Sequence, residues 1–228
     1  MNEKIKIISV GGSIIIPKTG FDIEFLKQFR QLILEEVEKG YKFILVIGGG
    51  ATCRTYQAAA SEITKMTSED LDWLGIYTTY YNAEFVRLLF GKDAYSEIIK
   101  NPTKKIKTDK AIVLAGGWEP GCSTDRDAVL LAKNFKVKEI INLSNFDFVY
   151  SADPKKDASA KPFKKLSWTE MRKIVGDIWN PGANAPFDPL AVKEAQALGL
   201  KVTFVQGTKL AEVRKAIEGD EIDGTVVE

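Results

Sequence analysis

Three glycine clusters are the parts of the sequence best suited to chemistry. Gly11-Gly12-Ser13, Gly48-Gly49-Gly50 and Gly116-Gly117 each follow directly on an apolar run of strand length. Glycine lets backbone N–H groups approach a ligand closely, and the start of a following helix favours a negative charge. The ends of parallel strands share one sheet edge, where ligands of open α/β sheets bind. The sequence therefore predicts a site for a phosphate-rich ligand, although any single cluster could serve only as a tight turn.

Missing residue types exclude much other chemistry. The 228-residue chain has no histidine, which rules out Ser-His-Asp and Cys-His nucleophiles and imidazole zinc sites. Two cysteines, Cys53 and Cys122, are too few for a disulfide framework and are typical of a reducing compartment. Lysine plus arginine number 32 against 31 acidic residues, so the net charge of +1 favours neither nucleic acid nor anionic membrane. With apolar runs too short to span a bilayer, we expect a cytoplasmic protein without nucleic-acid or membrane partners.

The common phosphate-binding motifs are not complete in this chain. Gly48, Gly50 and Cys53 do not make the dinucleotide fingerprint, and no glycine-lysine-serine/threonine sequence forms a P-loop. The sequence therefore argues against a standard hydride-transfer domain and against a P-loop enzyme.

The elements that must position the glycine clusters alternate between strands and helices. Apolar runs predict strands at residues 5–10, 43–47, 111–115, 139–143, 201–205 and 224–227. Periodic stretches with capping residues predict helices at about 22–39, 51–65, 67–89, 124–135, 167–176, 188–199 and 208–218. Because parallel strands need crossover helices, we predict an α/β fold, a three-layer α/β/α sandwich with a mainly parallel central sheet.

The glycine clusters also belong to a longer set of motifs that occur in a fixed order. The set comprises Val-Gly-Gly-Ser at 10–13, Val-Ile-Gly-Gly-Gly at 46–50 with Arg54, Leu-Asp-Trp-Leu-Gly at 71–75, Gly-Gly-Trp-Glu-Pro-Gly-Cys-Ser-Thr-Asp at 116–125, Ser-Asn-Phe-Asp-Phe-Val-Tyr-Ser-Ala-Asp-Pro-Lys-Lys at 144–156 and Phe-Asp-Pro-Leu-Ala at 187–191. Each motif alone is weak. Together they resemble the uridylate (UMP) kinases of the archaeal type, within the amino acid kinase family, over essentially the whole chain.

The resemblance implies one domain of two lobes, an acceptor lobe at about residues 1–135 and an ATP lobe at about 136–228, usually assembled as a homohexamer. It implies ATP contacts at Gly12, Ser13, Gly50, Arg54, Ser144, Asn145, Tyr150 and Asp153. It implies UMP contacts at Gly49, Asp72, Trp118, Glu119, Pro120, Gly121, Cys122, Ser123 and Thr124. The catalytic residues would be Asp125, Arg54 and Lys193. The implied cofactors are ATP as co-substrate and Mg²⁺, for which no protein ligands are assigned.

Phosphoryl transfer to UMP suits a chain without histidine. The accepting phosphate has a second pKa near ~6 and is already ionised at neutral pH. The reaction therefore needs positioning and charge neutralisation rather than a general base, and backbone N–H groups, Arg54 and Mg²⁺ can supply both. The expected reaction gives UDP and ADP, a step of pyrimidine nucleotide synthesis.

Several of these residues also have plainer explanations. Asp125 could simply stabilise the start of its helix, and Asp72 could be a solvated carboxylate. Trp118 and Tyr150 are equally typical of packing residues, and Lys193 of an exposed helix surface.

The chain departs from the family pattern at four positions. Ala51 stands where the archaeal pattern has lysine, Cys122 where it has histidine, Phe148 where it has glycine, and Val10 where many members have a strand-end lysine. The change at Ala51 removes a possible phosphate contact. Two alternatives therefore stay open: another small-molecule kinase of the same fold, and a non-catalytic nucleotide-binding, oxyanion-binding or storage protein.

Overall fold

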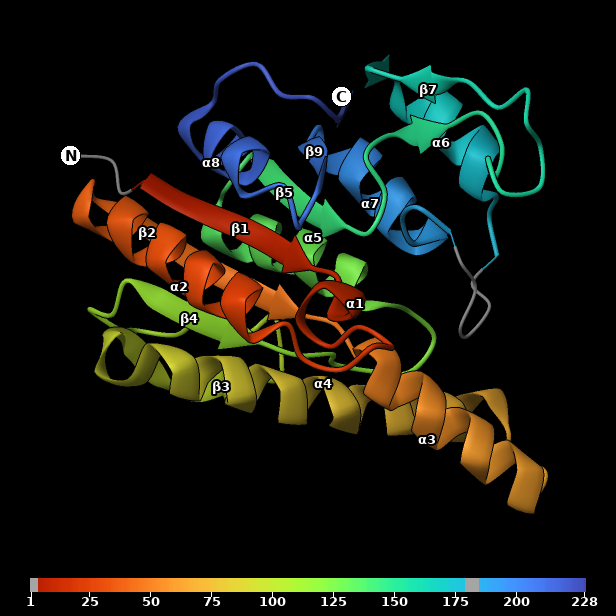
Figure 1. Ribbon diagram of the computed structural model, residues 1–228, viewed down its shortest axis with the longest axis horizontal. Coiled ribbons are helices and arrows are strands. Elements are labelled where there is room, and N and C mark those ends of the chain that lie inside the picture. Colours follow the sequence, from red (N-terminus) through yellow and green to blue (C-terminus); the bar gives the residue numbers. More distant parts are fainter. Residues whose placement is uncertain (1–3, 179–184) are drawn as a thin grey trace.

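Strand β1 (Lys4–Val10) runs through the middle of the sheet, because both of its faces are apolar and must be covered. The computed structural model describes residues 4–178 and 185–228. Its main sheet has eight strands in the order β3-β4-β2-β1-β5-β9-β10-β8 (Figure 1). The other members are β2 (Tyr41–Ile47), β3 (Ala94–Ile99), β4 (Ile112–Ala115), β5 (Glu139–Ser144), β8 (Lys165–Leu166), β9 (Lys201–Gln206) and β10 (Thr225–Val227). All neighbouring pairs are parallel except β9 with β10, so the predicted mainly parallel sheet is confirmed.

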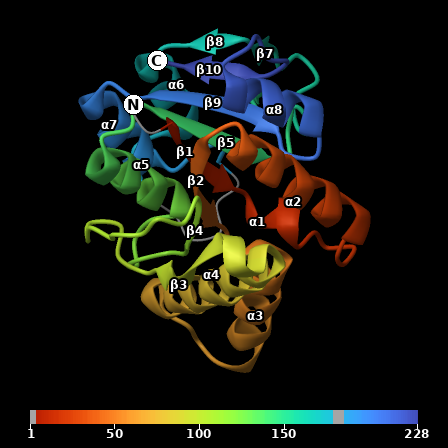
Figure 2. The ribbon, with the colours of Figure 1, turned by 90° about the vertical axis from the view of Figure 1, so that its left-hand side faces the viewer.

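Helices cover the two faces of this sheet (Figure 2). The core on one face receives side chains from α1 (Gly12–Ile15), α2 (Ile23–Glu38), α4 (Ser68–Phe90) and α8 (Leu210–Glu218). The core on the other face receives them from α5 (Thr124–Phe135), α6 (Trp168–Val175) and α7 (Pro189–Leu198). Neighbours in β1 alternate between the two cores, with Ile8 in the first and Ile7 in the second. The three-layer α/β/α sandwich is therefore confirmed.

Two helices extend the molecule at one end of the sheet. Helix α3 (Gly50–Ile63) packs against the first half of α4, and both lie at the lower edge of Figure 1. Helix α4 begins with a capping box between Thr67 and Asp70, and α6 with the predicted one between Ser167 and Glu170. No helix in the described ranges is long and apolar enough to cross a membrane.

Some elements were not predicted. Strand β3 lies at the sheet edge and exposes Ser96 and Glu97, so it lacks the apolar run of an inner strand. Helix α1 and the 3₁₀ turn η1 (Gly91–Asp93) are too short to show a period. The same holds for β8 and for the separate pair β6 (Val149–Tyr150) and β7 (Pro162–Phe163), whose strands have only two residues each.

Candidate active site

The first two glycine clusters meet at the carboxyl ends of β1 and β2. These strands are parallel, with Val10 opposite Ile47, so both chains turn at the same level. A Cβ atom added to Gly12 would lie 2.0 Å from the backbone nitrogen of Gly50. Gly50 itself has a φ of +66°, which side-chain-bearing residues rarely adopt. Only glycine allows the two turns to come this close.

A side chain of helix α4 fixes the second glycine cluster, Gly48-Gly49-Gly50. The side-chain amide of Asn82 is completely buried and donates hydrogen bonds to Gly48 O at 2.9 Å and Gly49 O at 3.0 Å. Helix α3 then begins at Gly50, so its N-terminus opens at this edge of the sheet. The arrangement is the predicted one, with a helix dipole and a fixed glycine turn available to an anion.

A cavity of about 800 Å³ lies beside these turns. Eleven of the residues that the family resemblance singles out line it: Ser13, Gly49, Gly50, Arg54, Asp72, Trp118, Glu119, Cys122, Ser123, Thr124 and Asn145. Gly12, Pro120, Gly121 and Asp125 are neighbours in sequence of lining residues but do not line it themselves. Segments far apart in the chain are thus gathered at one edge of the sheet.

Three cations line the cavity. Arg54 from α3 lines it together with Lys18 and Lys155, and all three side chains are exposed. Among the described residues none of these three forms an ion pair, whereas many other arginines and lysines of the chain do. A phosphate entering the cavity would therefore meet positive charges that are not already neutralised.

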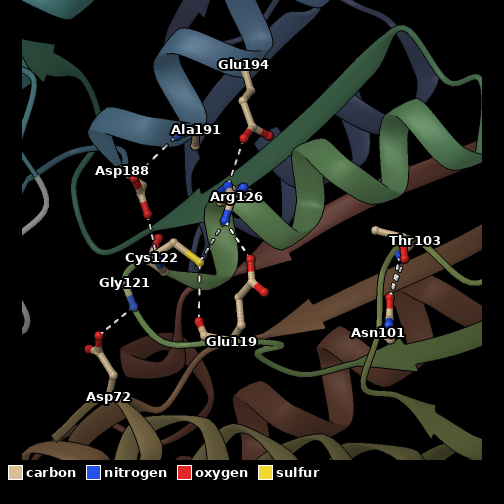
Figure 3. Close-up of polar contacts among 11 residues, drawn as sticks. Asp72, Asn101, Thr103, Glu119, Gly121, Cys122, Arg126, Asp188, Ala191 and Glu194 are labelled. Carbon is tan, nitrogen blue, oxygen red and sulfur yellow. Dashed lines mark hydrogen bonds and ion pairs between the residues drawn. The ribbon is translucent and has the colours of Figure 1, made fainter. Parts of the chain in front are cut away.

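The turn at residues 116–124 forms the opposite wall and is fixed by side chains from two helices. Asp72 of α4 accepts a hydrogen bond from Gly121 N at 2.7 Å, and Asp188 accepts one from Ser123 N at 2.6 Å (Figure 3). Asp188 also caps α7, with Leu190 N donating at 2.7 Å. Two carboxylates therefore hold this wall in place, so Asp72 has a structural contact in addition to its predicted contact with the ribose.

Arg126 links the same turn to α7. Its guanidinium contacts Glu194 at 2.8 Å and Glu119 at 3.1 Å, and reaches the sulfur of Cys122 at 3.8 Å (Figure 3). Burial, with Asp127 nearby, raises the pKa of the Cys122 thiol to about 12. Cys122 is therefore a neutral side chain that donates to Glu119 O rather than a reactive thiolate.

Asp125 lies beneath the cavity, between strands β1 and β5. Its Oδ1 accepts hydrogen bonds from Ser9 Oγ and from Asn142 Nδ2, both at 3.0 Å. Ser144 Oγ donates to the Asn142 side chain at 2.5 Å, so Ser144 also belongs to this network. Burial, followed by the nearby charge of Asp188, raises the pKa of Asp125 to about 6. The network ties both strand ends together under the ligand cavity.

Three of the predicted residues lie away from the cavity. The Nζ atom of Lys193 donates to Asp177 O at 3.1 Å and pairs with the Asp177 carboxylate at 3.4 Å. Lys193 is a residue of α7 that reaches Asp177, just past the end of α6, and it does not line the cavity. Tyr150 donates to Asp147 at 3.1 Å, and Asp153 accepts from Lys155 N at 3.0 Å within an exposed turn.

Other lining residues were not assigned a role from the sequence, among them Lys18, Gln57, Thr79, Asp127 and Lys155, the last of which lies in the motif at 144–156. Thr79 accepts a hydrogen bond from Gly117 N at 2.7 Å and so supports the third glycine cluster. The sequence pattern does indicate that Asp127 is buried, because it precedes Leu131 by four residues on the apolar stripe of α5. Lys18 and Lys155 sit in polar turns, where lysine is too common to be informative.

Known proteins are similar to this chain in sequence and in fold. The sequence profile of the amino acid kinase family matches residues 4–206. The chain is 32% identical over 226 residues to a uridylate kinase of Pyrococcus abyssi, covering 97% of this chain and 98% of that protein. It is 30% identical over 223 residues to a uridylate kinase of Hyperthermus butylicus, covering 96% of each.

Solved structures agree with the sequence comparison. The crystal structure of uridylate kinase from Archaeoglobus fulgidus has a TM-score of 0.81 and 30% identity, and covers 98% of this chain and 100% of that one. The UMP kinase of Bacillus anthracis, at 22% identity and a TM-score of 0.76, shares the fold. With a family profile that matches most of its length and relatives that match nearly all of it, the chain belongs to the amino acid kinase family.

Proposed function

We propose that this protein transfers the γ-phosphoryl group of ATP to UMP, giving UDP and ADP for pyrimidine nucleotide synthesis in the cytoplasm. The observation that carries the proposal is the cavity, which is lined by the glycine turns, by three cations without ion pairs among the described residues, and by the apolar side chains of Ile76 and Trp118. A nucleotide likewise combines charged phosphates with a planar base. The near full-length similarity to uridylate kinases supports UMP as the acceptor.

The residues divide between two lobes. In the acceptor lobe, at about residues 1–135, Gly49, Asp72 and the turn from Trp118 to Thr124 would hold UMP. ATP would enter from the other lobe past Asn145, with Ser13, Gly50 and Arg54 at its phosphates. Tyr150 and Asp153 would contact ATP only if their turns approach the cavity when ATP binds. Asp125 would position the two strand ends on which both phosphates rest.

Magnesium would arrive with ATP. Within the described residues, no group of three or more acidic or cysteine side chains is placed to hold a metal ion. Mg²⁺ keeps several waters and takes oxygens from nucleotide phosphates, so the site needs no such group. When bound there, Mg²⁺ would neutralise phosphate charge, while Arg54 and the glycine N–H groups orient the two nucleotides in line.

An exposed aromatic face supports a homo-oligomer, which we propose is a hexamer. Trp73, Tyr77 and Tyr81 follow one another at four-residue spacing on α4 and are 37%, 64% and 74% exposed. Tyr56 and Ile63 of the adjoining α3 are also exposed. A single-copy protein rarely leaves such a stripe in water, so a second copy is expected to cover it. Light scattering on the purified protein measures the state directly, and a monomer would contradict the proposal.

The deciding experiment is a coupled ADP-release assay with ATP and magnesium. The acceptors compared are UMP, CMP, dUMP, AMP, N-acetylglutamate and isopentenyl phosphate. Strong activity with UMP alone supports the proposal. Activity only with another acceptor would assign a different kinase reaction to the same fold, and nucleotide-dependent thermal stabilisation without ADP release would assign a binding protein.

A further inference from the structure

A buried carboxyl group with an unused oxygen lines the cavity. Asp127 is 1% exposed, and its Oδ1 atom has no hydrogen-bond partner. Among the buried side-chain atoms of the described residues, only Glu36 Oε2 and Asn82 Oδ1 share this property. Neither of those two residues lines the cavity, whereas Asp127 does. The unpaired oxygen thus belongs to a side chain of the cavity wall.

The fold explains only one of the two oxygens of Asp127, which accepts a hydrogen bond from Trp118 N. The side chain lies on the buried stripe of α5 together with Ala128, Leu131 and Ala132. Burying the other oxygen without a partner disfavours folding. A carboxyl group kept at such a place is explained by a ligand that completes its hydrogen bonds.

The surroundings of Asp127 identify which part of a nucleotide would lie there. Trp118 and Cys122 adjoin Asp127, and Ile76 and Thr79 of α4 line the same cavity. The Thr79 hydroxyl already donates to Ile76 O and accepts from Gly117 N, and Cys122 donates to Glu119 O. Arg126, the cation whose charge acts on Asp127, is already paired with Glu119 and Glu194. A phosphate would therefore find no unpaired positive charge here, whereas a planar base would find apolar surface on Ile76 and Trp118.

The protonation of Asp127 determines what it offers to a base. Burial raises its pKa to about 8, opposed by a hydrogen bond from Trp118 N and by the charge of Arg126. The other titratable groups that face it are Glu119 in the turn, Asp188 at the start of α7, Tyr80 on α4 and the Cys122 thiol. At neutral pH the carboxyl is therefore largely un-ionised, with one O–H donor and one accepting oxygen.

We propose that Asp127 is a specificity-determining residue that reads the base of the acceptor nucleotide: its O–H donates to a ring carbonyl and its second oxygen accepts the adjacent ring N–H. The imide edge of uracil offers this pair of groups side by side. The inference rests on the proposed function, because it assumes that UMP occupies the cavity. Ionised Asp127 has no proton to donate, so it can keep only one of the two hydrogen bonds.

The test is UMP binding by titration calorimetry between pH 6.5 and 9.5, on the wild type, Asp127→Asn and Asp127→Val. For the wild type, the dissociation constant is expected to rise by up to about tenfold per pH unit above the pKa of Asp127, because binding requires a proton. Asp127→Asn carries a permanent donor and acceptor, and should keep at high pH the affinity that the wild type loses. The imide proton of uracil titrates in both proteins, so only the difference between them counts.

Asp127→Val removes both hydrogen bonds, so UMP should bind about tenfold or more weakly at every pH. Circular dichroism and ATP binding report whether this variant is folded, and Asp220→Asn, at an exposed carboxylate, is the control for loss of one charge. Identical pH profiles for wild type and Asp127→Asn, or full UMP affinity in folded Asp127→Val, would overturn the inference while UMP phosphorylation stood. If the wild type instead binds another nucleoside monophosphate and not UMP, the proposed acceptor is wrong, and the same pH comparison with that nucleotide decides the role of Asp127.

Discussion

The two sides of the cavity are built differently. We call these sides acceptor and donor after the function proposed above. On the acceptor side, the turn at 116–124 is fixed by hydrogen bonds to Asp72 and Thr79 of α4 and to Asp188 at the start of α7. On the donor side, Tyr150 bonds to Asp147 and Asp153 to its own turn, and neither lines the cavity. The acceptor side is therefore fixed by contacts between separate helices, whereas Tyr150 and Asp153 of the donor side bond only within their own turns. We infer that the binding site of the accepting nucleotide is the more preorganised of the two.

The largest effect is expected at Asp125, which lies under both sides. Asp125→Asn keeps the size of the side chain but removes the charge that accepts from Ser9 and Asn142. Turnover in the ADP-release assay should fall on the order of 10²–10³-fold, the range typical for removal of one preorganised electrostatic contact. Circular dichroism should remain that of the wild type. Unchanged turnover would remove Asp125 from the mechanism and leave it only a helix-start role.

Asp127 should make the acceptor side sensitive to pH even without ligand. Its pKa of about 8 in the folded protein lies far above that of an unfolded aspartate, about 3.9. As pH rises from about 4 to about 8, the unfolded chain releases this proton and the folded chain keeps it, so this group contributes progressively less stability. Asp127→Asn abolishes this loss, which amounts to about 2–3 kcal/mol between pH 5 and pH 7.

Urea unfolding of the wild type and Asp127→Asn at pH 5, 7 and 9 measures this difference. The free energy of unfolding of the variant relative to wild type should increase from pH 5 to 7 and level off once the pH exceeds the folded pKa. A difference in unfolding free energy that stays constant over this range would mean that Asp127 is ionised in the folded protein. The two sides of the cavity would then not differ in their response to pH.

Arg54 tests the cationic part of the cavity. Arg54→Ala removes an exposed cation that has no ion pair among the described residues, so folding should not suffer. Loss of a charge-assisted contact of about 1.5–3 kcal/mol predicts a fall of about 10–100-fold in kcat/KM for UMP. Lys65→Ala, an exposed cation beyond the end of α3, is the matched control. Equal effects of the two variants would show that only net charge matters.

Asp72 tests the fixed wall directly. Asp72→Ala frees Gly121 N and loosens the turn, so KM for UMP should rise several-fold, equivalent to about 1 kcal/mol. If Asp72 also accepts a ribose hydroxyl, the variant should discriminate less between UMP and dUMP in steady-state kinetics. A higher KM with unchanged discrimination would limit Asp72 to holding the turn.

The smallest effect is expected on the donor side. Tyr150→Phe removes one hydrogen bond at a partly exposed side chain, and the free energy of unfolding should change by no more than about 0.5 kcal/mol. Urea denaturation measures this change. A loss comparable to that of a core substitution would mean that the donor side is as firmly built as the acceptor side.

Sequence patterns were sufficient where local and global structure agree. The capping box at Ser167 and Glu170 and the Asp188-Pro189 helix start lie where they were predicted, because capping depends on residues a few positions apart. The meeting of the glycine clusters followed from the parallel sheet alone. Strand β3 could not be predicted in this way, because Ser96 and Glu97 interrupt its apolar pattern at the sheet edge.

The residues that lie away from the cavity, or that sequence reasoning missed, depend on tertiary contacts. Lys193 is held by Asp177, which reaches it only through the packing of α6 against α7. Lys18 and Lys155 line the cavity because the fold brings their turns to it. The spacing of residues in the sequence does not predict this placement. Asp127, by contrast, was visible as a carboxylate on an apolar stripe, and this kind of conflict marks functional positions.

The contact between Gly12 and Gly50 also restricts how the sequence can vary. Any Cβ at Gly12 would overlap backbone atoms of Gly50, and one at Gly50 would lie 2.6 Å from Gly12 O. Relief of one clash does not relieve the other, so neither glycine can be exchanged singly without moving a strand end. Gly121 is also at positive φ but has open space around it, so asparagine, which adopts positive φ more readily than other residues, would be the least strained replacement. In a library of all single substitutions, Gly12 and Gly50 should be positions without viable variants. Gly121 should accept a few.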